Sequence, residues 1–318
     1  MRDRVIFPFL LLMLSFGLTA FADQGGPGPE GLFDVGGYRL RLSCIGQGSP
    51  AVIMDHGLGG SSADWSKVRS SLAATTQACV YDRAGYGDSD PGPPPRTSGK
   101  IAAELRTLLQ RAGVEPPYLL AGHSFGGYNM RMFASFFPER TAGLVLVDTP
   151  NEGQVDGVFQ SQIMRQIDPE GILKHLWSPQ LLEPLWSVDL TPFAPLFGYP
   201  VKTLQAILAE LAAFKESSEE LRAADIHADT PLVIIMHGLR VLPDGTLGDE
   251  MEQEWMRLQR ELAAHYRRSR FIVAPQSAHN IPLDQPELVA AAIQRLVLEA
   301  SPTSDRRPLP GAPAPSHQ

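Results

Sequence analysis

The most informative stretch of the chain is Tyr118-Leu-Leu-Ala-Gly-His-Ser124-Phe-Gly-Gly127, followed by a helical pattern that begins at Tyr128. The apolar run before Gly122 predicts a buried strand, and Gly-x-Ser-x-Gly after it predicts a tight turn. Such a turn holds Ser124 in a strained backbone conformation, and glycine on either side avoids clashes where the turn packs. The N–H groups at the start of the following helix favour negative charge nearby. We therefore predict that Ser124 is a nucleophile.

A serine hydroxyl needs a neighbouring base, and the chain offers eight histidines. His279 follows the last predicted strand, in a loop that can carry it back over the carboxyl edge of the sheet. We predict that His279 is the base, with His237, at the end of the preceding strand, as the alternative. His123 adjoins Ser124, so its side chain leaves the turn in a different direction, and we predict a structural role for it.

A second glycine-rich turn, His56-Gly-Leu-Gly-Gly60, follows an apolar strand that begins near Val52. Glycine there lets the backbone approach a substrate closely. We predict that an oxyanion hole is formed by the N–H groups of Leu58 and of Phe125, the residue after the nucleophile.

The rest of the chain alternates short apolar runs, rich in β-branched residues, with longer helical patterns, which predicts an α/β fold with a parallel sheet. The predicted strands lie near residues 38–44, 51–56, 77–82, 118–122, 143–148, 231–236 and 270–274. The predicted helices of the core lie at 101–110, 252–266 and 286–298. Between 151 and 228 this rhythm breaks, and we predict an inserted helical cap there. The core is accordingly predicted over 23–150 and 229–300.

Both ends of the chain differ in composition from this core. Residues 1–22 hold two arginines, an apolar run too short to span the roughly 30 Å hydrocarbon core of a bilayer, and Ala20-Phe-Ala22. This pattern predicts a cleaved export signal, with an uncleaved anchor as the alternative. The proline-rich residues 301–318 are predicted to be disordered. We expect a secreted or periplasmic protein with no stable membrane anchor after cleavage.

Composition excludes several other classes of function. The formal charge of −8 at pH 7, with no run of lysine or arginine, argues against a nucleic-acid partner. The chain has only two cysteines and no His-Glu-x-x-His pair, so we predict neither a metal site nor a cofactor.

Four motifs, in this order and spacing, closely resemble the α/β-hydrolase superfamily: HGLGG at 56–60, YDRAGYGDS at 81–89, GHSFGG at 122–127 and AHNIPLD at 278–284. Over roughly residues 30–300, the resemblance implies an eight-stranded, mostly parallel sheet with a cap after the sixth strand. It also implies a Ser-acid-His triad in that chain order, and a structural role for Asp82 and Arg83. Haloalkane dehalogenases and epoxide hydrolases of this superfamily use an aspartate nucleophile, so Ser124 argues against both chemistries.

The resemblance leaves two candidates for the triad acid. The common position is the turn after the seventh strand, and here Asp244 comes several residues late. Asp148 ends the sixth strand, from which some superfamily members supply the acid. We favour Asp148, with Asp244 as the alternative. A purely structural role is also open for each, as a cap of the turn before Pro150 for Asp148 and as part of a surface turn for Asp244.

Cys44 and Cys79 fall on what the resemblance makes the second and fourth strands, which are neighbours in that sheet. Together with an export signal, this placement favours a disulfide, with two buried free thiols as the alternative.

These predictions describe an exported, metal-free serine hydrolase that cleaves a small-molecule carboxylic ester through an acyl-enzyme. Amide or peptide hydrolysis, acyl transfer and perhydrolysis are alternatives, because the same triad supports all of them. The alternative of a different class is a non-catalytic ligand-binding protein on the same scaffold.

Overall fold

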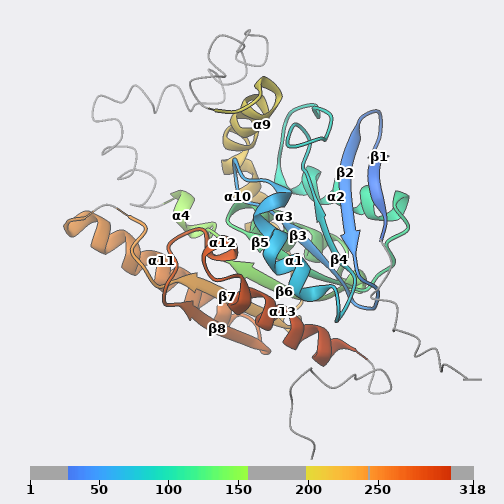
Figure 1. The fold of residues 1–318 in the computed structure, drawn as a ribbon. Coiled ribbons are helices and arrows are strands. Elements are labelled where there is room, and N and C mark those ends of the chain that lie inside the picture. Colours follow the sequence, from blue (N-terminus) through green and yellow to red (C-terminus); the bar gives the residue numbers. More distant parts are fainter. Residues whose placement is uncertain (1–27, 157–197, 243, 302–318) are drawn as a thin grey trace, which may run out of the picture.

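The computed structural model describes residues 28–156, 198–242 and 244–301, which are built around an eight-stranded sheet (Figure 1). The strand order is β1-β2-β4-β3-β5-β6-β7-β8. Pairing is antiparallel between β1 and β2 and between β2 and β4, and parallel elsewhere. The strands are β1 (Glu30–Asp34), β2 (Arg39–Ile45), β3 (Ala51–Asp55), β4 (Ala78–Tyr81), β5 (Tyr118–His123), β6 (Thr141–Val147), β7 (Leu232–His237) and β8 (Ser269–Ala274). This confirms the predicted fold class.

Strand β1 is the one that the local pattern does not predict. It reads Glu-Gly-Leu-Phe-Asp, without the continuous apolar run that marks a strand buried on both faces. It lies at one edge of the sheet and pairs only with β2, and its side chains are at most half-buried. The resemblance, which implies eight strands, is what predicts it.

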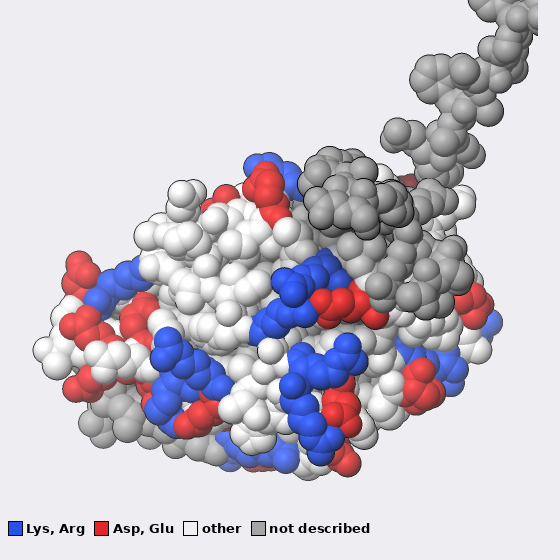
Figure 2. All heavy atoms as spheres, turned by 90° about the horizontal axis from the view of Figure 1, so that it is seen from below, with Lys and Arg blue, Asp and Glu red and all other residues white. Residues whose placement is uncertain are grey.

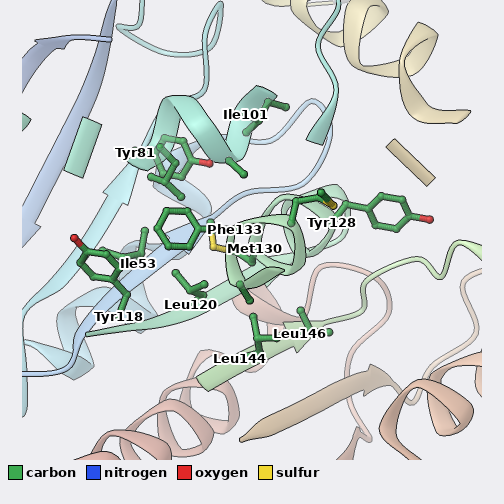
Figure 3. Close-up of a cluster of buried hydrophobic side chains, with 14 of the residues drawn as sticks. Ile53, Tyr81, Ile101, Tyr118, Leu120, Tyr128, Met130, Phe133, Leu144 and Leu146 are labelled. Atoms are coloured by element: carbon green, nitrogen blue, oxygen red, sulfur yellow. The ribbon is translucent and has the colours of Figure 1, made fainter. Parts of the chain in front are cut away.

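Helices cover both faces of the sheet, because alternate side chains of a strand point to opposite sides. Ile53 and Leu120 lie in the cluster covered by α2 (Ser98–Arg111) and α3 (Phe125–Phe136), part of which is drawn in Figure 3. Their neighbours Val52 and Leu119 lie in the opposite cluster, covered by α1 (Ser66–Leu72) and α13 (Pro286–Ala300). Each fully buried leucine or isoleucine contributes about 1.5–3 kcal/mol to folding.

The structure describes seven further helices. They are the 3₁₀ helices η1 (Ser62–Trp65) and η2 (Pro138–Arg140) and the α-helices α4 (Gly153–Asp156), α9 (Val201–Ala212), α10 (Phe214–Ala223), α11 (Thr246–Ala264) and α12 (Ile281–Asp284). The helices predicted at 101–110, 252–266 and 286–298 correspond to α2, α11 and α13. Helix α2 extends three residues further toward its start, where the Thr97 hydroxyl accepts a hydrogen bond from the Lys100 N–H at 3.2 Å.

Helices α9 and α10 follow β6 and α4 in the chain and precede β7, within the predicted cap. Helix α9 lies against the loop that follows β4: the Thr203 hydroxyl donates to the Gly85 carbonyl at 2.9 Å, and Lys202 Nζ donates to the Gly87 carbonyl at 2.6 Å. Helix α10 packs on α3, where the rings of Phe214 and Tyr128 stack with centroids 5.2 Å apart. The rest of the predicted cap, 157–197, lies outside the described residues.

Residues 1–22, the predicted export signal, also lie outside the described residues, as does the predicted tail beyond Ser301. Within the ranges that are described, no helix has both the length and the apolar composition needed to cross a membrane.

A disulfide joins the two cysteines. Cys44 of β2 lies directly opposite Cys79 of β4 in the antiparallel pair, and both residues are buried. The bond agrees with the predicted pairing, because adjacent antiparallel strands bring opposite side chains within bonding distance.

Charged side chains of both signs are interspersed on the face drawn in Figure 2. Exposed side chains of opposite sign also form ion pairs, such as Arg257 with Glu254 and Arg267 with Asp229. The face in this view carries no uniform basic patch of the kind that binds a phosphate backbone.

Candidate active site

Ser124 lies in the turn between β5 and α3, with backbone torsions φ 52° and ψ −125°. A positive φ is strained for a residue with a side chain, and hydrogen bonds maintain it here. The Ser124 N–H donates to the Val147 carbonyl of the neighbouring β6 at 2.9 Å, and the Ser124 carbonyl accepts from Gly127 N–H at 2.9 Å. The strained turn leaves Ser124 half-buried at the carboxyl edge of the sheet.

Close approaches between segments explain one glycine of this turn and one of the loop after β3. A Cβ at Gly126 would lie 2.5 Å from the Asp55 carbonyl oxygen, so α3 begins directly against the end of β3. A Cβ at Gly57 would lie 3.2 Å from the Cβ of Ser124. The glycine-rich loop after β3 therefore passes immediately beside the candidate nucleophile.

The candidate acid and base are in direct contact. Asp148 comes directly after β6, the neighbour of β5, and its Oδ2 lies 2.7 Å from His279 Nδ1. Because a carboxylate only accepts hydrogen bonds, Nδ1 carries the proton and Nε2 is the basic nitrogen of a neutral His279. Asp148 has no solvent exposure, whereas the His279 side chain is 33% exposed.

The charge of Asp148 is stabilised by its two histidine partners. Burial acts to raise the pKa of its carboxyl, but hydrogen bonds from His237 and His279 outweigh burial and hold this pKa below its usual value. Asp148 is therefore ionised at neutral pH.

Ser124 and Asp148 share an unusual backbone conformation. Over the ranges that the structure describes, they are the only non-glycine residues with positive φ, 52° and 46°. Each follows the carboxyl end of a strand, and these two strands are adjacent. Strained residues gather at functional sites, so the backbone marks the same place as the side chains.

His123 makes contacts that fit the structural role predicted for it. Its Nε2 lies 2.8 Å from the His279 carbonyl oxygen, and the two rings have centroids 4.8 Å apart. Burial, reinforced by the nearby His279, lowers the pKa of His123 to about 4, so it is neutral at pH 7. Because a carbonyl only accepts, Nε2 carries the proton, and this bond holds the His279 backbone over the sheet edge.

Neither alternative residue takes the place of His279 or Asp148. His237 is 3% exposed, with Nδ1 2.6 Å from Asp148 Oδ1 and Nε2 2.7 Å from Glu252 Oε2, so neither ring nitrogen is left to act as a base. The side chain of Asp244 is fully exposed and lies 3.4 Å from Arg240. The structure brings Asp148, and not Asp244, to His279. Glu252 is not predicted from the sequence, because only the fold brings α11 to the end of β7.

The predicted oxyanion donors belong to the two segments that meet at Ser124, the loop after β3 and the start of α3. Phe125 is the first residue of α3, and Leu58 packs against the buried cluster that contains Phe125. Arg83 anchors the loop that contains Leu58. Its guanidinium donates to the His56 carbonyl at 2.6 Å and to the Gly57 carbonyl at 3.2 Å. The two backbone N–H groups therefore come from segments with little freedom to move.

Asp82 and Arg83 have contacts that fit the structural role implied for them. Asp82 accepts hydrogen bonds from the N–H groups of Ser62 and Asp88, each at 3.3 Å, and so ties together the loops after β3 and β4. Arg83 also contacts Asp55 at 2.7 Å.

Comparison with known proteins places this chain in a family. A model described as "Alpha/beta hydrolase family" matches residues 52–292. The uncharacterized protein YqjL of Bacillus subtilis is 27% identical over 249 residues, which cover 78% of this chain and 83% of that protein. The putative carbamate hydrolase RutD of Azorhizobium caulinodans is 35% identical over 113 residues, covering 36% of this chain and 42% of that protein.

Solved structures agree with this placement at the level of the fold. An esterase from Thermogutta terrifontis superposes with a TM-score of 0.58 and 22% identity, over 85% of this chain and 98% of that one. The family model covers the strands and loops that carry Ser124, Asp148 and His279. This chain belongs to the alpha/beta hydrolase family.

Proposed function

We propose that this protein is an exported serine hydrolase that cleaves carboxylic esters through an acyl-enzyme. The observation that carries the proposal is the contact of His279 with the buried, ionised Asp148, at the same sheet edge as the strained Ser124. Each of these features has a defined task in nucleophilic catalysis by a serine hydroxyl.

In the first half of the reaction, Ser124 Oγ attacks the ester carbonyl carbon while its proton passes to His279 Nε2. The carbonyl oxygen becomes an oxyanion, which accepts hydrogen bonds from the N–H groups of Leu58 and Phe125. When the tetrahedral intermediate collapses, the C–O bond to the alcohol breaks and the alcohol takes the proton from His279.

In the second half, water attacks the acyl-enzyme and gives its proton to His279. The acid product leaves as the proton returns to Ser124 Oγ. Asp148 stays ionised throughout: it holds the Nδ1–H of His279 and stabilises the imidazolium that forms twice in each cycle.

Serine as the nucleophile favours acyl chemistry over the aspartate-dependent reactions of epoxide hydrolases and haloalkane dehalogenases. Cleavage of a C–N bond is the second candidate. This candidate is supported by the similarity to RutD, which covers 36% of this chain. The name of RutD describes it as a putative carbamate hydrolase. Acyl transfer and perhydrolysis use the same acyl-enzyme with a different acceptor.

The proposed location is the periplasm or the exterior of the cell. The signal-like residues 1–22 support export, and a buried disulfide persists best in an oxidising compartment. The proposed cap over 151–228 would cover the site and select the acyl or alcohol group of the substrate.

A fluorophosphonate probe tests the proposal directly. We expect it to label Ser124 in the native protein and to leave Ser124→Ala unlabelled, with peptide mapping as the readout. Rates on aryl esters of increasing acyl length, measured beside the matching anilides, then separate ester from amide preference. A protein that takes up no probe and cleaves neither series is the non-catalytic ligand-binding alternative.

A further inference from the structure

The carboxylate of Asp148 is shared by two histidines. Oδ2 contacts His279 at 2.7 Å, and Oδ1 contacts Nδ1 of His237 at 2.6 Å. On its far side, His237 Nε2 lies 2.7 Å from Glu252 Oε2. The four side chains therefore form one continuous line, Glu252–His237–Asp148–His279, of which a serine triad needs only the last two.

The protonation of His237 follows from its two partners. A neutral imidazole carries one N–H, so one of its nitrogens would turn a lone pair toward a carboxylate oxygen. An imidazolium donates from both nitrogens and satisfies both contacts. Glu252 is fixed for this purpose, because its Oε1 accepts from the N–H groups of Val241 and Leu242 at 2.7 and 2.8 Å, which leaves Oε2 for His237.

Among the described residues, Trp255 and Arg240 lie near this line of side chains, and Arg240 interacts electrostatically with Glu252. From α11, the buried Trp255 packs its ring edge-on to His237, with centroids 5.5 Å apart, and also lies 6.1 Å from the His279 ring. Arg240, in the loop after β7, binds Asp249 and lies 3.4 Å from Asp244. Burial acts to lower the pKa of His237, but its contacts with Asp148 and Glu252 outweigh burial and raise it.

We propose that His237, kept as an imidazolium by Glu252, is a positioning residue for the triad. It occupies one oxygen of Asp148 and offsets part of the charge of that carboxylate. The inference rests on the proposed function and adds a part to it. Because Oδ1 is occupied, His279 can bind only Oδ2, which sets the direction of its ring. Because a cation lies beside Asp148, part of the negative charge that this carboxylate presents to the triad is offset.

The triad needs an unprotonated base, so kcat/KM falls as pH decreases. Without the cation beside Asp148, the full charge of this carboxylate faces the base and favours its protonated form. The acid limb of the kcat/KM profile then moves to higher pH, by roughly one pH unit, which is the usual effect of losing one nearby charge.

The variant Glu252→Gln tests the expected shift of the acid limb while it keeps the hydrogen bonds. The amide oxygen must stay on the N–H groups of Val241 and Leu242, so the amide NH₂ faces His237 Nε2. His237 then becomes neutral and still donates Nδ1–H to Asp148. Every contact keeps a partner and only the charge is lost, so a merely structural role for Glu252 predicts no shift of the acid limb.

The control is Glu250→Gln, which removes the same charge from an exposed position on the same helix. We expect the acid limb to move up in Glu252→Gln and to stay in place in Glu250→Gln. His237→Gln removes the same cation by a second route and should shift the limb in the same direction. An unmoved limb in folded Glu252→Gln overturns the proposal.

A spectroscopic measurement decides the protonation state without any assay. Histidine ¹⁵N resonances, assigned through His237→Gln, should show both nitrogens of His237 protonated at neutral pH in the native protein, and one in Glu252→Gln. A neutral His237 in the native protein also overturns the proposal. If the protein cleaves no ester, the proposed function fails, and the spectrum alone then decides whether His237 is held as an imidazolium.

Discussion

Arg83 and Glu210 form a bidentate ion pair with no solvent exposure on either side chain. Arg83 Nε lies 2.7 Å from Glu210 Oε1, and Arg83 Nη2 lies 2.9 Å from Oε2. Glu210 belongs to α9 of the proposed cap, and Arg83 also holds the loop that carries Leu58. One guanidinium thus connects a helix of the proposed cap to the segment that we propose stabilises the oxyanion.

Glu210→Gln should destabilise the protein because it leaves a buried guanidinium with reduced compensation. Breaking a buried pair typically costs about 3–5 kcal/mol, and the lower end is expected here because Asp55 still contacts Arg83. Thermal and denaturant unfolding measure this cost. The control Glu219→Gln, which breaks an exposed pair with Lys215 on α10, should change stability by less than about 1 kcal/mol. Equal stabilities for the two variants would contradict a structural role for the Arg83–Glu210 pair.

Ser124→Ala should remain folded, since a small half-buried hydroxyl is removed, and should lose several orders of magnitude in ester turnover. Circular dichroism checks the fold and steady-state kinetics the activity. Turnover close to that of the native protein would remove the basis of the proposed function.

Asp148→Asn should preserve the fold and lower kcat by orders of magnitude, because an amide neither stabilises the imidazolium of His279 nor fixes its tautomer. Asp244→Asn should have little effect, because that side chain is fully exposed. The two variants are compared by kcat at the same pH. The reverse ranking, with both proteins folded, would move the triad acid to the loop after β7.

His123 should make stability depend on pH in a defined window. Its pKa is about 4 in the folded protein and about 6.5 in the unfolded chain, so only the unfolded state takes up a proton between these values. Stability therefore decreases as pH falls from about 6.5 to about 4, by about 3 kcal/mol for this group. Denaturant unfolding at several pH values should show a shallower decrease in His123→Gln. Parallel curves for the two proteins would refute this account.

Replacing both cysteines by alanine should lower the melting temperature. The disulfide closes a loop with a sequence separation of 35. In the chain-entropy model, such a loop contributes about 3–4 kcal/mol. Calorimetry of the native and double-variant proteins measures the difference, and alkylation without reductant should find no free thiol. Two reactive thiols in exported protein would contradict the bridge.

The local sequence pattern was sufficient to locate much of the core. Seven strands, three helices of the core and Ser124 with its turn could be located from the sequence, because each depends on nearby residues. A continuous apolar run such as Leu144-Val-Leu-Val147 requires burial on both faces of a sheet, and Gly126 is needed because β3 lies against it. These contacts are made by distant segments, but each requires a particular residue type or a short run of them, so the local sequence is enough to locate it.

The partners within the site depended on contacts between distant segments. Asp148 and Asp244 both follow strands, and only the folded loops show that one is buried against His279 while the other is in solvent. His237 could be a base by its position alone, until Glu252 of α11 occupies its second nitrogen. The pairing of Arg83 with Glu210 joins residues 127 positions apart. Which charged groups meet is decided by tertiary packing, because buried charges require partners and the sequence does not state which segments will supply them.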